Sequence, residues 1–102
     1  MSKKIRGDYK TRKVWIGEQE LLPGPSQRIV NHSPDGFGWG YGGSGPSQLA
    51  LAIVFYYCKN KSKAIKIYQD FKWDIIAELP QTDFEISETS IRQWIDIRAD
   101  SL

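Results

Sequence analysis

Six of the nine glycines in this 102-residue chain fall within residues 36–45, directly before an apolar run at residues 49–54. Glycine loses much backbone freedom on folding, so residues 37–41 are expected to form a weakened strand or a shaped loop. Pro46 suits the first turn of a helix, where its missing N–H would be unpaired anyway. The segment therefore predicts a loop that opens into a buried helix capped by Ser44 or Gly45.

The glycine loop is chemically suited to an anionic ligand. Free backbone N–H groups are expected at Gly42, Gly43, Ser44 and Gly45, where the helix start adds partial positive charge. The Ser44 hydroxyl and the Gln48 amide are further candidate contacts. A loop whose glycines only allow tight packing on the helix explains the same residues, so both interpretations stay open.

Three aromatic residues alternate with these glycines, namely Phe37, Trp39 and Tyr41. In an extended segment their rings would share one face and could stack a nucleotide base. Aromatic rings of this kind also fill small cores, and core packing is expected for at least one of the three.

The sequence contains only part of the known phosphate-binding motifs. Residues 38–43 match G-x-G-x-x-G, but a dinucleotide fold also needs an acid about 20 residues later. Residues 58–62 contain no acid, and the chain has no Gly-Lys-Ser or Gly-Lys-Thr for a Walker loop. Only the general mechanism of anion binding by loop N–H groups remains.

Catalytic groups are scarce in this chain. Ser44 lies in a pattern similar to G-x-S-x-G, but Pro46 replaces the last glycine. Its only candidate base is His32, the single histidine, which could instead hold its own turn. One histidine and the single Cys58 do not form a metal site. We therefore expect no catalytic residues, no metal and no cofactor, and binding rather than turnover.

The periodicity predicts an α+β fold: a small antiparallel sheet of short strands packed with about three helices, the first of them central and buried. Residues 1–8 are expected to be a flexible basic arm, and residues 9–102 a single domain. The expected strands are residues 13–16, 20–22, 27–31 and 84–86. The expected helices run from Ser44 or Gly45 to near Asn60, from Ser62 to Leu79, and onward from Ser87 or Thr89. The predicted inner stripe of the second helix is Ala64, Ile65, Tyr68, Phe71, Ile75 and Leu79.

Charge is unevenly distributed along the chain, although the net charge is only +2. Residues 1–34 carry seven Lys or Arg and three acids, and residues 35–66 carry four Lys or Arg and one acid. Residues 67–102 carry three Lys or Arg and eight acids. The basic part includes the glycine loop, which favours an anionic ligand. The low net charge argues against binding of duplex nucleic acid, although the basic arm could bind single-stranded nucleic acid.

The location and assembly of the protein are suggested by composition. A lone cysteine fits a reducing compartment, and the sequence shows neither an export signal nor a long apolar run. We therefore expect a cytoplasmic protein that does not enter membranes. An almost wholly apolar first helix and four tryptophans are compatible with a homodimer.

One long motif resembles a known family. The sequence NHSPxGFxWGYGGSGPxQLALA, at residues 31–52, is similar to a family of small phage and prophage proteins catalogued as a domain of unknown function. A looser likeness extends over residues 9–97. The resemblance implies a phage-associated setting, the cytoplasm of the host cell, and brings no reaction, cofactor or catalytic residue.

These observations lead to three functional hypotheses. The first is a non-enzymatic counter-defence protein that holds a small phosphorylated nucleotide in the glycine loop. Its proposed contacts are Arg28 as charge partner, with His32, Trp39, Tyr41, Gly42, Gly43, Ser44, Gly45 and Gln48. The alternative is an inhibitor that docks on a host defence complex or nuclease through exposed aromatic residues. The third is a small hydrolase that uses Ser44 and His32.

Overall fold

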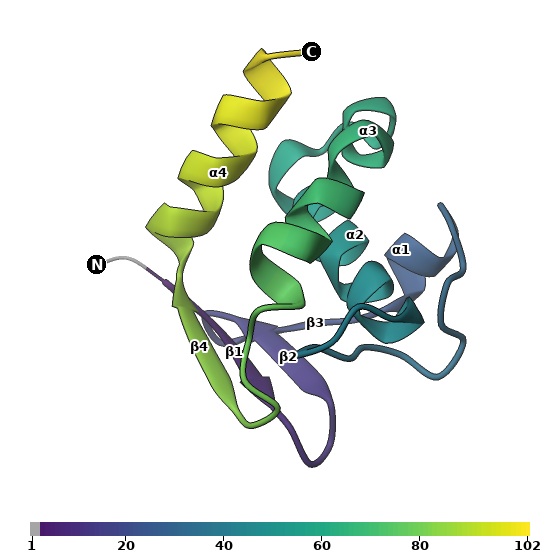
Figure 1. Cartoon of the computed structure of the whole chain (residues 1–102), viewed down its shortest axis with the longest axis vertical. Helices are drawn as coiled ribbons and strands as arrows, with labels where there is room; N and C mark the ends of the chain where they lie inside the picture. Colours follow the sequence, from purple (N-terminus) through teal and green to yellow (C-terminus); the bar gives the residue numbers. More distant parts are fainter. Residues whose placement is uncertain (1–2) are drawn as a thin grey trace.

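The computed structural model describes residues 3–102, in which a single antiparallel sheet carries the helices on one face (Figure 1). The strands are β1 (Lys4–Asp8), β2 (Lys13–Ile16), β3 (Gln19–Leu21) and β4 (Phe84–Ser87), in the spatial order β3-β2-β1-β4. The helices are α1 (Gly24–Gln27), α2 (Ser44–Cys58), α3 (Lys61–Phe71), the π-helix η1 (Lys72–Ile76) and α4 (Glu88–Asp100). The predicted α+β class with an antiparallel sheet is confirmed.

Strand β1 lies inside the sheet and pairs antiparallel with both β2 and β4. Its Ile5 is fully buried and lies opposite Ile16 on one side and Ile86 on the other. The segment expected to belong to a flexible basic arm is thus a strand from Lys4 onward, because its exposed cations alternate with buried residues. Residues 1 and 2 of that arm lie outside the described residues.

Helix α2 is the central buried helix that the sequence predicts. Every residue from Gly45 to Val54 is buried, which agrees with a helix that is apolar nearly all round. Gly43 forms its N-cap, and Lys59 ends it in the left-handed conformation with φ of 53°. Asn60 then caps α3 by accepting the N–H of Lys63 at 3.0 Å.

The segment predicted as a strand at residues 27–31 follows a short helix instead. Helix α1 starts after Pro23 with a second proline in its first turn, a position that proline favours. The backbone N–H groups of Ile29 and Val30 both bond to the carbonyl oxygen of Ser26 at 3.0 Å, so they belong to a tight turn. The strand prediction was wrong because proline chemistry outweighed the β-branched residues.

The second predicted helix is interrupted by η1. The N–H of Ala77 donates to the carbonyl of Lys72, five residues earlier, at 2.8 Å. This wider turn rotates the following side chains, so Ile76 is fully buried and Ile75 only partly. Ile65 was also assigned wrongly to the inner stripe, because 44% of it is exposed.

Strand β4 and helix α4 form where the sequence predicts them. The Ser87 hydroxyl accepts the N–H of Ser90 at 3.4 Å and begins α4, whose Ile91 and Ile95 are buried. Within residues 3–102, no helix is long and apolar enough to cross a lipid bilayer.

Candidate functional site: the start of helix α2

The glycine loop between Gly36 and Gly43 has no regular secondary structure and is fastened to the end of η1. The N–H of Gly40 donates to the carbonyl of Ile76 at 3.0 Å, and the Gln81 side-chain amide donates to the carbonyl of Gly40 at 3.1 Å. Gly40 has a φ of 82°, which glycine adopts without strain. Of the two predicted forms, the segment is therefore a shaped loop.

Two glycines of the loop make room for aromatic rings. A Cβ on Gly42 would lie 2.3 Å from Cη2 of Trp73, and a Cβ on Gly43 would lie 2.5 Å from Cε2 of Tyr41. Any larger residue would collide with these rings. Close packing is thus one reason for the glycines, and it brings Trp73 of η1 against the loop.

The three rings of the loop do not share one face. Phe37 and Trp39 are buried, whereas 49% of Tyr41 is exposed. The Trp39 indole N–H donates to the carbonyl of Thr82 at 2.8 Å, and its ring meets Phe84 edge-on with centroids 4.8 Å apart. Trp39 is therefore a core residue and cannot stack a ligand, contrary to the proposed contact. Tyr41 is left as the ring available to solvent.

The side chain of Gln48 is fully buried and all its polar atoms are engaged. Its Oε1 accepts the backbone N–H groups of His32 and Ser33 at 2.8 and 3.0 Å. Its Nε2 donates to the Ser26 hydroxyl at 2.8 Å and to the Val30 carbonyl at 3.2 Å. Gln48 thus ties α1 and the following turn to α2, and no atom of it is free to bind a ligand.

His32 is directed toward α3 rather than toward the glycine loop. Its Nε2 lies 2.6 Å from the hydroxyl of Tyr68. No hydrogen bond joins His32 to Ser44 in the described part of the chain, so the two do not form a nucleophile–base pair. The residues described also contain no group of three potential metal ligands.

The first residues of α2 and its cap remain accessible. Gly42 and Ser44 are exposed and Gly43 is half-buried, whereas Gly45 is buried against Gly38. Among residues 3–102, no acceptor bonds to the backbone N–H of Gly42, Gly43 or Ser44. These donors therefore have no partner within the described residues, and they lie at the positive end of a 15-residue helix.

Arg28, the proposed charge partner, is exposed at the C-cap of α1. Within the described residues it makes no hydrogen bond or ion pair with the glycine loop. The structure thus does not join it to the accessible donors of α2.

Two residues of η1 that the sequence did not single out for the site border this helix start. Trp73 is 55% exposed and touches Gly42 with the edge of its ring. Lys72 is only 7% exposed, and its Nζ lies 4.2 Å from the centroid of the Trp73 ring. We call Tyr41, Gly42, Gly43, Ser44, Lys72 and Trp73 the α2-start site. Lys72 lies on the buried side of the α3–η1 segment, four residues after the buried Tyr68.

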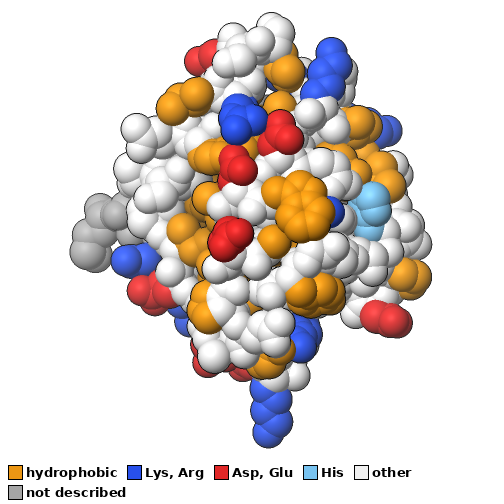
Figure 2. Space-filling model, viewed as in Figure 1, with side chains coloured by type: hydrophobic (Ala, Val, Ile, Leu, Met, Phe, Trp, Pro, Cys, Tyr) orange, Lys and Arg blue, Asp and Glu red, His pale blue; other side chains and the backbone are white. Residues whose placement is uncertain are grey.

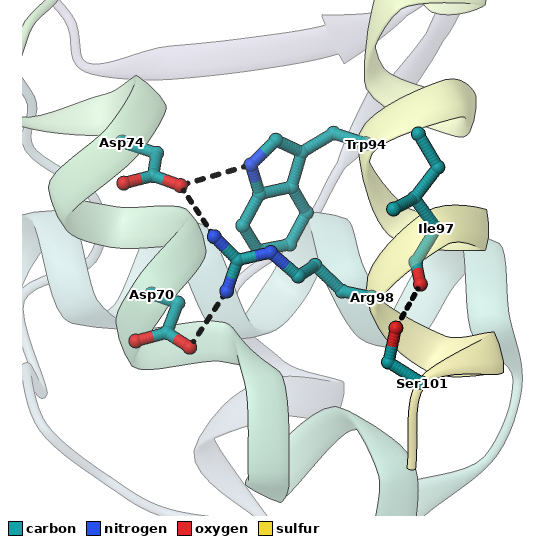
Figure 3. Close-up of polar contacts among 6 residues, drawn as sticks. All are labelled: Asp70, Asp74, Trp94, Ile97, Arg98 and Ser101. Atoms are coloured by element: carbon teal, nitrogen blue, oxygen red, sulfur yellow. Dashed lines mark hydrogen bonds and ion pairs between the residues drawn. The ribbon is translucent and has the colours of Figure 1, made fainter.

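The acidic residues nearest to Lys72 along the chain are directed to another helix. Asp70 and Asp74 bind the two guanidinium nitrogens of Arg98 on α4 at 3.0 and 3.2 Å, as Figure 3 shows. Asp74 also accepts the indole N–H of Trp94 at 3.1 Å. Asp70 and Asp74 are therefore part of the contact between α4 and the α3–η1 segment.

A separate apolar groove of about 360 Å³ lies between β3, α1 and the C-terminal half of α2. Strand β3 is an edge of the sheet, so the groove runs beside unpaired backbone groups. Its lining includes Leu21, Leu22, Phe55, Tyr56, Glu20 and Lys59.

Comparison with known proteins identifies the family but no activity. Residues 5–97 match the family described as Family of unknown function (DUF6166). The chain belongs to this family. Neither the curated proteins nor the solved structures gave a match. Membership in DUF6166 covers β1 through most of α4, so the α2-start site and the groove both lie within the family region.

Proposed function

We propose that this DUF6166 protein is a non-enzymatic binding protein that holds a small phosphorylated nucleotide at the α2-start site. The observation that carries the proposal is the set of N–H groups at the accessible residues Gly42, Gly43 and Ser44, to which no acceptor within residues 3–102 bonds. A helix N-terminus favours phosphate through these donors and through its partial positive charge. Because α2 is buried and rigidly packed, the donors are held in place before a ligand arrives.

The exposed rings beside these donors favour a nucleotide over a bare anion. Tyr41 and Trp73 are 49% and 55% exposed and contact neighbouring glycines of the cap. Such rings can stack a base, at about 1–3 kcal/mol per stacked base. The contact between His32 Nε2 and the Tyr68 hydroxyl argues against His32 as a general base for Ser44. This favours a binding function over hydrolysis.

The biological setting that we propose is phage counter-defence. The motif at residues 31–52 resembles small phage and prophage proteins. A phage gains from a small protein that removes a nucleotide signal of the host defence from solution. This role requires tight binding and no turnover.

Screening by thermal shift and isothermal titration calorimetry tests the proposal. Mono-, di- and cyclic nucleotides should be titrated into the wild-type chain, with the matched nucleosides as controls for the phosphate. We expect at least one nucleotide to bind and its nucleoside to bind more weakly. Absence of binding at millimolar nucleotide would refute the proposal.

The alternative, an inhibitor that docks on a host defence protein, is favoured by the groove beside β3. Its lining is mainly apolar and includes Leu22, 57% of which is exposed. An extended segment of a partner could pair with the edge strand and place side chains in such a groove. Under this alternative, Leu22→Ser should abolish partner binding while Ser44→Ala leaves it unchanged.

A further inference from the structure

We propose that Lys72 supplies the positive charge of the α2-start site and that its natural counter-ion is a phosphate monoester of the ligand. The inference rests on the proposed function and deepens it. The role of charge partner, first assigned to Arg28, passes to Lys72 of the α3–η1 segment, because the structure does not join Arg28 to the site.

The environment of Lys72 is unusual for a lysine without an ionic partner. The residue is 7% exposed, and within residues 3–102 no carboxylate lies within ion-pairing distance of its ammonium. No buried side-chain nitrogen or oxygen of the described residues lacks a hydrogen-bond partner. The ammonium of Lys72, which has no acceptor, must therefore reach solvent at the end of a buried stem.

The position of the ammonium is set by Trp73. Lys72 Nζ lies 4.2 Å from the centroid of the indole, and the edge of the same indole rests on Gly42. The ammonium and Gly42, the residue before the N-cap of α2, thus border one side chain. On the face shown in Figure 2, hydrophobic side chains lie beside the pale-blue histidine, and His32 bonds to Tyr68, four residues before Lys72.

The carboxylates that could neutralise Lys72 are held elsewhere. Asp70 and Asp74 flank it in sequence, but both bind Arg98 on α4, and Figure 3 shows their side chains directed to that helix. The contact with the Trp73 ring leaves the hydrogen-bonding capacity of the ammonium unused. A phosphate could accept from the ammonium and from the α2 donors together.

This arrangement defines the class of ligand. A phosphate monoester carries close to two negative charges at neutral pH and several acceptor oxygens, which match one ammonium and several N–H groups. A flat ring attached to that phosphate could lie on the outer part of Trp73 or on Tyr41. We therefore expect nucleoside monophosphates, with AMP as probe, to bind better than a cyclic diester such as 3′,5′-cyclic AMP.

The test compares AMP, inorganic phosphate and 3′,5′-cyclic AMP by calorimetry on the full chain. Lys72→Met keeps the apolar stem and removes the charge, Lys72→Arg restores a charge, and Lys66→Met on the exposed face of α3 is the matched control. We expect Lys72→Met to weaken AMP binding by roughly tenfold or more, the worth of one charged hydrogen bond. The same variant should flatten the dependence of AMP affinity on salt, because one screened charge is lost.

The outcomes separate the two proposals. If the wild type binds AMP and Lys72→Met binds it equally well with the same salt dependence, the inference on Lys72 is overturned while the proposed function stands. If the wild type binds none of the three probes and no other nucleotide, the proposed function fails. Partial recovery by Lys72→Arg and an unchanged Lys66→Met would support the assignment. Amide chemical shifts of residues 42–44 that respond to phosphate in Lys66→Met but not in Lys72→Met would support it independently of calorimetry.

Discussion

At the scale of single residues, Gln48 shows how one buried amide organises the region behind the α2-start site. It satisfies two backbone N–H groups of the turn at His32 and also bonds to Ser26 and Val30. A buried donor or acceptor that loses its partner costs about 1–3 kcal/mol. The structural role of Gln48 is therefore large, although it contributes no atom to a ligand.

Replacement of Gln48 by leucine is expected to destabilise the protein by roughly 3 kcal/mol, because several buried polar groups lose their partner together. Gln93→Leu, on the exposed face of α4, is the matched control and should change stability by no more than about 0.5 kcal/mol. Urea unfolding followed by circular dichroism measures both. Equal midpoints for the two variants would contradict the role assigned to Gln48.

Gly42 is expected to be intolerant of alanine because of Trp73. The added Cβ would lie 2.3 Å from the indole, so the ring must move, at about 1–2 kcal/mol in stability. Gly24→Ala is the control, since a Cβ there meets nothing within 4 Å. Near-ultraviolet circular dichroism should register the displaced indole in Gly42→Ala only. An unaltered spectrum would show that the ring does not rest on Gly42.

At the scale of elements, α4 contacts the α3–η1 segment through two acids four residues apart, a spacing that places them on one face of a helix. Arg98 reaches Asp70 on α3 and Asp74 on η1 together, and its guanidinium lies 4.9 Å from the Trp94 ring (Figure 3). These groups are partly exposed, so each ion pair is weak. The pairs direct both carboxylates to Arg98, and neither carboxylate pairs with Lys72.

Arg98→Ala is expected to lower stability by about 1 kcal/mol at low salt and by less at about 1 M NaCl, where screening weakens surface pairs. Arg92→Ala is the matched control on α4, since Arg92 pairs only with Glu88 of its own helix among the described acids. Unfolding in urea at the two salt concentrations measures the difference. A loss for Arg98→Ala that does not shrink with salt would point to packing on Trp94 instead.

At the scale of the whole molecule, the sheet depends on its first strand. Strand β1 joins β2 and β3 to β4 in the sheet. The first residue of β4, Phe84, lies 76 residues after Asp8, the last residue of β1. Ile5 and Gly7 are buried, and Phe84 of β4 packs where a side chain on Gly7 would lie. Strand β1 is therefore part of the core rather than an appendage.

Deletion of residues 1–8 is expected to abolish cooperative unfolding, because it leaves β4 without a neighbour and opens the core. The double variant Lys3→Gln/Lys4→Gln removes the same local charge but keeps the strand, and it should unfold cooperatively at nearly the wild-type temperature. Differential scanning calorimetry distinguishes the two. A cooperative transition in the deletion variant would restore the idea of a dispensable basic arm.

Local signals predicted much of the fold. The glycine–proline junction located the start of α2, and Ser87 located the start of α4. Both are decided within a few residues by capping chemistry. The strand β1 was missed because charged residues on its exposed face concealed the alternation. The π-helix was missed because a single wide turn leaves no periodic signal in so short a segment.

The sequence by itself determined a buried central helix that begins at an exposed, glycine-lined cap. It did so because proline, glycine and the apolar run act over neighbouring residues. The tertiary structure alone decided which side chains surround that cap. Trp39 bonds to Thr82 and Gln48 to Ser26, contacts between residues 43 and 22 positions apart that remove both from the site. Lys72 and Trp73 join the site because packing brings η1 against Gly42. Such neighbours arise from the meeting of distant segments, which no local pattern records.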